Sequence, residues 1–185
     1  MASFGAVQNQ FLIPGLSTPR LYLRLLEPGD RERVLPFFEH PLSHQYWITE
    51  GKPPATLCKE WFDKQQWRYA ENRGGALAVV RKLDDALLGW CGLLVQEVDR
   101  KTELEVGYSI LPAYWGNGYA PEAAKRCLQA GFEKELAPSI ISIIQVHNLP
   151  SIRVAEKNGL VREKETLYHG NPVYVYRIFP PDFRP

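Results

Sequence analysis

Apolar and polar residues follow two different periods along this chain, and the order of those periods predicts a mixed α/β fold. Alternation with period 2, or one continuous apolar run, predicts a strand, and apolar residues at helical spacing predict a helix. Helices are expected after Asp30, where Pro36 shortens the helix, from a cap at Thr56 to Asn72, over 119–136 and over 148–158. The expected strands are 20–26, 76–81, 86–96, 103–111, 140–146, 160–167 and 173–179.

The clearest pattern is a strand, a glycine turn and a helix start within residues 103–122. Gly116-Asn117-Gly118 ends the strand, and Pro121 stands in the first helical turn, where its missing N–H costs no hydrogen bond. Such a turn leaves backbone N–H groups exposed at the positive end of a helix dipole, which favours an anion, most naturally phosphate. The alternating strand residues are Leu104, Val106, Tyr108 and Ile110 on one face, and Glu103, Glu105, Gly107 and Ser109 on the other.

Composition excludes several classes of protein. With 185 residues, 45% hydrophobic and 23% charged, the chain is expected to form one domain over residues 19–181. A loose arm over residues 1–18 precedes it, in which Phe11, Leu12 and Ile13 are candidates to dock on the body. A formal net charge of +1 gives no reason to expect nucleic acid or an anionic membrane as partner.

Cysteine spacing and hydropathy bear on location. Cys58, Cys91 and Cys127 lie far apart and lack the close spacing of a zinc or redox motif, so we interpret them as buried or partly buried free thiols in a reducing compartment. No apolar run is long enough to span a bilayer, and the first residues lack the basic segment of a signal peptide. The expected location is the cytoplasm.

Two common phosphate-binding loops do not fit the glycine turn. A P-loop needs Gly-Lys-Ser/Thr before its helix, and this chain has Gly118-Tyr119-Ala120. A dinucleotide fingerprint needs a small residue three positions after Gly118, where Pro121 stands, and it needs a parallel unit instead of the expected antiparallel hairpin.

The turn Trp115-Gly116-Asn117-Gly118-Tyr119-Ala120 resembles the acyl-CoA pyrophosphate loop of the GNAT superfamily of N-acetyltransferases. The branch that contains the ribosomal-protein N-terminal (alanine/serine) acetyltransferases is similar at four further segments in the same order: 18–24, 88–92, 105–108 and 148–160. The resemblance implies a mostly antiparallel sheet of about seven strands with about four helices. It also implies that strands 103–111 and 140–146, fourth and fifth in order, splay apart to admit pantetheine.

The resemblance further implies acetyl-CoA as cosubstrate, no metal, and a set of CoA-binding residues. Ser109 or Ile110 would supply a backbone donor to the developing oxyanion. Asn148 has two compatible roles, as the N-cap of its helix and as a contact to pantetheine or phosphate. The expected CoA-binding residues are Ser109, Ile110, Leu111, Trp115, Gly116, Asn117, Gly118, Tyr119, Ala120, Asn148 and Ser151.

Acetyl transfer to an amine requires a group that takes a proton from nitrogen and one that protonates the departing thiolate. Glu105 is the candidate base, with Glu103 as second candidate, although an outward glutamate on a strand is often only solvated. Many family members carry a tyrosine acid where this chain has Ala155. Ser151 is the candidate in its place, or a plain first-turn serine. Tyr108 is expected in the core.

The acceptor pocket is expected between the loop 40–54 and the last hairpin. His40 and His44 are four apart, but Pro41 and the lack of nearby acidic ligands argue against a metal. We assign His44, Tyr46, Trp47 and His169 to the acceptor site, with core packing as the alternative for Trp47.

The sequence predicts an N-acetyltransferase that acetylates a primary amine, on a protein N-terminus or a small molecule, by direct attack. The alternatives are a non-catalytic acyl-CoA-binding domain that acts as sensor or interaction module, and, less favoured, a nucleotide-phosphate enzyme. Either a monomer or a homodimer is compatible with the sequence.

Overall fold

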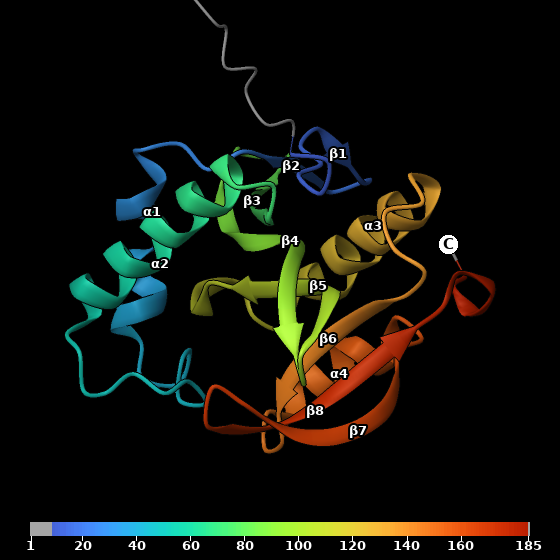
Figure 1. Ribbon diagram of the computed structural model, residues 1–185. Helices are drawn as coiled ribbons and strands as arrows, with labels where there is room; N and C mark the ends of the chain where they lie inside the picture. Colours follow the sequence, from blue (N-terminus) through green and yellow to red (C-terminus); the bar gives the residue numbers. More distant parts are fainter. Residues whose placement is uncertain (1–8, 185) are drawn as a thin grey trace, which may run out of the picture.

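The computed structural model describes residues 9–184, which form one eight-stranded sheet with four α-helices (Figure 1). The strand order is β1-β2-β3-β4-β5-β6-β8-β7, and β5–β6 is the parallel pair among antiparallel ones. This confirms the mixed α/β prediction. The strands are β1 Leu16–Ser17, β2 Leu21–Arg24, β3 Gly74–Arg81, β4 Leu87–Val98, β5 Lys101–Ile110, β6 Ile140–Gln145, β7 Val161–Tyr168 and β8 Asn171–Ile178. The α-helices are α1 Asp30–Glu39, α2 Pro54–Ala70, α3 Tyr119–Glu133 and α4 Leu149–Lys157.

The sheet opens between β5 and β6. Strand β5 pairs with β4 over ten registered positions, from Lys101 to Ile110, but with β6 at one position, Glu105 opposite Ile141. Beyond that pair β6 turns away and pairs with β8 over all six of its residues. The predicted splay is confirmed, and it leaves backbone groups of β5 and β6 facing one another across an opening.

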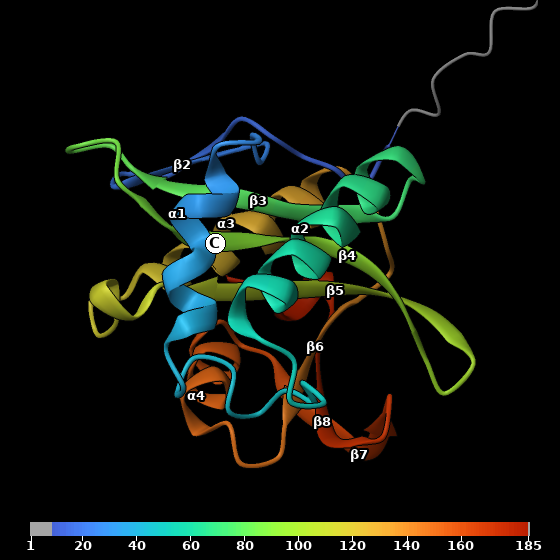
Figure 2. The same ribbon diagram turned by 90° about the vertical axis from the view of Figure 1, so that its left-hand side faces the viewer.

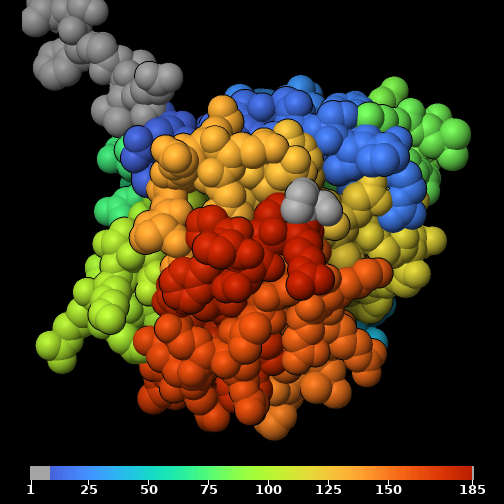
Figure 3. Space-filling view, turned by 90° about the vertical axis from the view of Figure 1, so that its right-hand side faces the viewer, coloured from blue at the N-terminus to red at the C-terminus, as the bar shows by residue number. Residues whose placement is uncertain are grey.

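Helices cover both faces of the sheet (Figure 2). Along β3, Leu77 and Val79 belong to the core cluster under α3, whereas Ala76, Ala78 and Val80 belong to the cluster under α1 and α2. Because successive side chains of a strand point to opposite faces, cover on both sides makes β3 almost continuously buried. The segment after β8 lies against α3, where the rings of Phe132 and Phe183 are 5.5 Å apart (Figure 3).

Part of the expected arm is built into the sheet. Residues 1–8 lie outside the described residues, but β1 at Leu16–Ser17 is the strand beyond the expected seven. Ile13 is buried, and Phe11 and Leu12 pack partly buried against the main core, so these three residues do dock on the body. The Asn9 side chain donates to the Arg68, Tyr69 and Gly74 carbonyls and so joins this segment to α2 and β3.

Three boundaries differ from the predicted ones. Helix α2 starts at Pro54 instead of being capped by Thr56, because proline suits a first turn whose N–H has no helical partner. Gly74 begins β3 instead of ending the helix, and a Cβ there would lie 2.0 Å from the Leu93 carbonyl oxygen. The last hairpin turns through His169 and Gly170 alone, both with positive φ (49° and 81°), the geometry of a tight two-residue turn.

The three cysteines are buried free thiols, as the sequence predicts. Cys91 of β4 and Cys127 of α3 face each other with 3.6 Å between their Sγ atoms. Within residues 9–184, no helix is long and apolar enough to cross a membrane.

Candidate functional site

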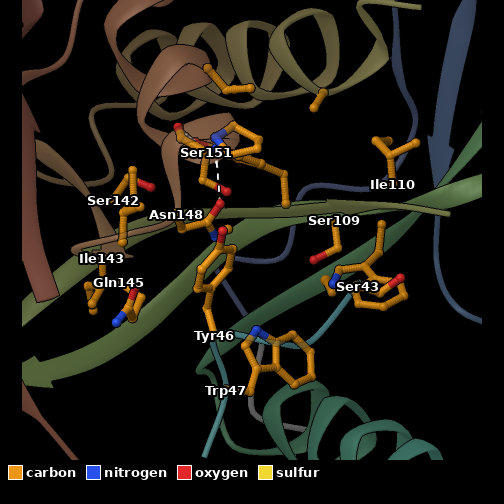
Figure 4. Close-up of a pocket in the computed structure, with 18 of the residues that line it drawn as sticks. Ser43, Tyr46, Trp47, Ser109, Ile110, Ser142, Ile143, Gln145, Asn148 and Ser151 are labelled. Atoms are coloured by element: carbon orange, nitrogen blue, oxygen red, sulfur yellow. Dashed lines mark hydrogen bonds between the residues drawn. The ribbon is translucent and has the colours of Figure 1, made fainter. Parts of the chain in front are cut away.

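The opening between β5 and β6 leads into a cavity of about 940 Å³. The loop before α2, helix α2, β4, β5, β6 and the last hairpin line it, together with the first turns of α3 and α4. Figure 4 shows this convergence, with Ser109 and Ile110 on one side and Ser142 and Ile143 on the other. Tyr46 and Trp47 reach the cavity from the loop before α2. Elements distant in the sequence therefore build one site.

The glycine turn lies at this cavity with its backbone fixed. Gly116 and Gly118 have positive φ (78° and 76°), and Gly118 is the N-cap of α3. The Asn117 side chain lies outside the cavity lining and holds the turn by donating to the Tyr114 and Trp115 carbonyls, 3.0 Å each. The Trp115 indole N–H donates to the Ile110 carbonyl at 2.7 Å and ties the turn to β5. A helix N-terminus leaves its first N–H groups without helical partners, so this fixed turn is chemically suited to an anion.

A cation stands beside this turn. Arg20 donates from Nη1 to the Asn117 carbonyl at 2.9 Å and lies 4.6 Å from the centre of the Tyr119 ring. Its Nη2 lies 2.5 Å from Glu122 Oε2, and Thr18 donates to Oε1 of the same carboxylate. The negative charge in the first turn of α3 is thus engaged by Thr18 and Arg20, while about half of the arginine side chain stays exposed. Arg20, which lies in the motif segment 18–24, was not among the residues predicted for the site.

A second helix N-terminus adjoins the same cavity. Asn148 caps α4, as predicted, because its Oδ1 accepts the Ser151 N–H at 3.2 Å (Figure 4). The Asn158 amide donates to the Pro121 carbonyl at 3.2 Å and joins the end of α4 to the start of α3. Two positive helix ends therefore face one space.

The backbone of β5 offers hydrogen-bonding groups to the opening. In an antiparallel ladder, alternate residues bond to the neighbouring strand, and the Leu111 N–H donates to the Leu88 carbonyl at 2.8 Å. By the same alternation along the β4–β5 register, the Ser109 N–H points toward β4 and bonds there. The N–H groups of Tyr108 and Ile110 point the other way, toward β6. Ser142 Oγ, which donates to the Val106 carbonyl at 3.3 Å, agrees with this phase. Leu111 itself is buried in the core cluster under α1 and α2 and does not line the cavity.

Glu105 is buried, with 8% of its surface exposed, so it is not an outward, solvated glutamate. Its carboxylate accepts from Gln96 Nε2 at 2.7 Å and from the Ile143 N–H at 3.3 Å. Burial raises the pKa of Glu105, against the opposing effect of these hydrogen bonds and of Arg68 and Lys64. Glu103 lies outside the cavity lining, where the Arg177 guanidinium at 2.7 Å lowers its pKa.

Tyr108 packs partly buried against the main core, as expected, and it also lines the cavity. Its hydroxyl donates to the Ser151 carbonyl at 2.9 Å, and burial raises its pKa. Ser151 lines the cavity too, and within residues 9–184 its hydroxyl has no hydrogen-bond partner of its own. Strand alternation alone put Tyr108 opposite Glu105, but where the sheet opens both side chains reach the same space.

The side of the cavity that the sequence analysis assigned to an acceptor is aromatic. Tyr46, Trp47 and His169 line it as expected, whereas His44 does not. Trp47 also packs against Phe37, with 5.5 Å between ring centres. The cavity lining also includes residues that were not predicted to belong to a site: Trp61, Lys64, Arg68, Trp90 and Gln96 are among them. Among residues 9–184, no group of three or more His, Cys, Asp or Glu side chains is placed to hold a metal ion.

Known proteins resemble this chain along most of its length. A family model described as "Acetyltransferase (GNAT) domain" matches residues 20–161. The uncharacterized protein YkkB of Bacillus subtilis (strain 168) is 33% identical over 163 residues, which cover 87% of this chain and 93% of that protein. The uncharacterized N-acetyltransferase YoaA of the same organism is 27% identical over 178 residues, 92% of this chain and 99% of that protein.

Solved structures share the fold. An acetyltransferase (GNAT family) from Bacillus anthracis superposes with a TM-score of 0.73 at 28% identity, covering 89% of this chain and 97% of that one. A spermidine N-acetyltransferase from Vibrio cholerae, in complex with CoA and spermine, gives a TM-score of 0.70 at 21% identity over 89% and 98% of the two chains. At that identity the second likeness concerns the fold alone.

The glycine turn makes a testable prediction. In Gly118→Ala the new Cβ would lie 3.5 Å from Arg20 Nη2, and the positive φ would cost about 1–2 kcal/mol, so the turn should lose its geometry. We expect the Kd for CoA, measured by titration calorimetry, to rise about tenfold or more. Gly15→Ala is the control, because Gly15 has a similar φ of +85°, open space around it and no place in the cavity lining. An unchanged Kd in Gly118→Ala would show that the phosphates bind elsewhere.

Proposed function

Because the chain belongs to the GNAT acetyltransferase family and is an N-acetyltransferase, we propose that it transfers the acetyl group of acetyl-CoA to a primary amine by direct attack. The observation that carries this proposal is the opening between β5 and β6, which joins two helix N-termini to one buried carboxylate. The domain responsible is proposed to span residues 19–181 and to work in the cytoplasm, which the buried free thiols support. Within the family we propose the ribosomal-protein branch, on the strength of residues 148–160.

The residues present suit each part of a CoA molecule. The free N–H groups at Gly118, Tyr119 and Ala120, with Arg20 beside them, suit the pyrophosphate. Pantetheine is an extended chain with amide groups, and the N–H groups of Tyr108 and Ile110 are placed to bond it as a further strand would. The oxyanion donor expected near Ser109 or Ile110 is therefore proposed to be the Ile110 N–H, because that of Ser109 is committed to β4.

The proposed reaction replaces a C–S bond by a C–N bond and moves one proton from nitrogen to sulfur overall. The neutral amine nitrogen attacks the carbonyl carbon, the new N–C bond forms, and the C–S bond breaks to release the thiolate. Glu105 takes the proton from nitrogen, directly or through water, and its raised pKa makes it a stronger base than an ordinary glutamate. The Ser151 hydroxyl passes a proton to the thiolate and regains one from water, and Tyr108 positions that turn of α4 by donating to the Ser151 carbonyl.

Removing the base should uncover a pH dependence. A general base acts when deprotonated, so wild-type kcat should fall as pH falls through the raised pKa of Glu105. In Glu105→Gln we expect kcat at neutral pH to drop by about 10²-fold or more and this limb of the pH profile to vanish, with the Kd for acetyl-CoA unchanged. Glu103→Gln is the matched control, two residues away on the same strand but outside the cavity. Equal kcat for wild type and Glu105→Gln at every pH would remove Glu105 from the mechanism.

The proton donor can be tested with a pair of variants. Ser151→Ala removes the hydroxyl but keeps the backbone N–H that Asn148 caps, so CoA binding should persist while kcat falls about tenfold or more. Tyr108→Phe removes only the hydrogen bond to the Ser151 carbonyl and should have the smaller effect on kcat. Single-turnover release of CoA, followed with a thiol reagent, measures the step directly. The opposite ranking of the two variants would assign the proton to Tyr108.

A further inference from the structure

The acceptor end of the cavity has an uneven balance of charge. Its ionised side chains are one carboxylate, Glu105, and two cations, Lys64 and Arg68. The two cations are four residues apart on α2 and therefore lie on one face of that helix. For an enzyme that acts on an amine, a second acidic group would be the simpler complement to a cationic substrate. The excess positive charge therefore calls for another explanation.

Neither cation is held by a direct ion pair in the part of the chain that the structure describes. Arg68 is 4% exposed, yet its partners are the Arg73 and Val95 carbonyls and Gln96 Oε1, and its buried Nε has no partner. Within residues 9–184, neither Lys64 nor Arg68 has a carboxylate oxygen within 4 Å. Burial lowers the pKa of both, and each is close enough to Glu105 to be affected by it. A bound anion would relieve this unfavourable arrangement.

The cations and the proposed base are separated by one side chain. Gln96 donates from Nε2 to Glu105 at 2.7 Å and accepts at Oε1 from Arg68 Nη2 at 2.9 Å. A molecule that presents an amine to Glu105 thus has the Arg68 guanidinium next along the same wall, separated from Glu105 by the Gln96 amide. That spacing suits an amine and a carboxylate on the same or adjacent carbon atoms.

The remaining wall is apolar. Trp61 and Trp90 pack at a tilt with 4.2 Å between ring centres, and Phe37 packs on Trp90 at 4.7 Å. Tyr46 and Trp47 close the cavity from the loop before α2, which the Asn171 amide ties to the last hairpin by donating to the Tyr46 carbonyl at 2.8 Å. An aromatic or large apolar side chain would bury well against this wall.

We propose that the acceptor is a small amino acid-like amine, with a carboxylate bound at Lys64 and Arg68, its amino group at Glu105, and an apolar or aromatic body against Trp61 and Trp90. This inference rests on the proposed function and narrows it. It disfavours acceptors that carry several positive charges, because Lys64 and Arg68 would repel them.

The test uses pairs of acceptors that differ only in the carboxylate. We expect kcat/KM to be about tenfold or more higher for tryptophan than for tryptamine, and for phenylalanine than for phenethylamine, since a charge-assisted contact is present in one of each pair. Spermidine should be the poorest of the five amines. Lys64→Met should lower kcat/KM for tryptophan about tenfold and reduce the ratio over tryptamine. Lys59→Met is the matched control, an exposed lysine of the same helix that pairs with Asp63 outside the cavity.

The outcomes distinguish this inference from the function beneath it. Acetylation of tryptamine or spermidine at least as efficient as that of tryptophan would overturn the inference and leave the N-acetyltransferase function intact. A ratio unchanged by Lys64→Met would also overturn it. Acetyl-CoA binding without acetylation of any of the five amines would overturn the inference, and the proposed function would fail only if N-terminal peptides released no CoA either.

Discussion

The site depends on hydrogen bonds that β5 and β6 do not make with each other. In a closed sheet each strand edge is satisfied by its neighbour, but here the two strands meet at Glu105 and Ile141 and then part. Backbone groups left without a neighbouring strand need other partners, because an unpaired buried N–H or C=O is costly. On β5 the Val106 carbonyl accepts from Ser142 and the Ile110 carbonyl from Trp115. Those side chains fix the shape of the opening, and the N–H groups of Tyr108 and Ile110 remain for a ligand.

The same divergence explains why a carboxylate is buried at this point. The Ile143 N–H of β6 lies beyond the point where β5 and β6 pair, and it donates a hydrogen bond to Glu105 Oε1 instead. Gln96 holds the other oxygen, and Arg68 holds Gln96. A residue that completes the backbone hydrogen bonding of a split sheet is thereby withdrawn from water, and the withdrawal raises its pKa. Glu105 therefore owes both its structural role and its proposed role as base to its position where the pairing of β5 with β6 ends.

Local features of the site could be predicted from the sequence, and features made by convergence could not. The glycine turn, the Asn148 cap and the alternation of β5 are written in neighbouring residues, and each appears where expected. Alternation gave the right faces for Glu105 and Tyr108, but it could not show that the sheet opens and that both side chains reach the cavity. Lys64, Arg68 and Gln96 come from α2 and β4, and no spacing in the chain connects them with Glu105. Thr56 was a plausible cap, but two adjacent prolines already begin the helix.

We propose that the edge of β5 facing the opening holds the pantetheine arm of CoA. Amide hydrogen exchange tests this binding at single residues. On addition of CoA, the Tyr108 and Ile110 amides should exchange much more slowly, because both gain an acceptor in the opening. The Ser109 amide, already committed to β4, should change little. Slowing of Ser109 alone, or no change at Tyr108 and Ile110 when CoA is bound, would contradict the claim.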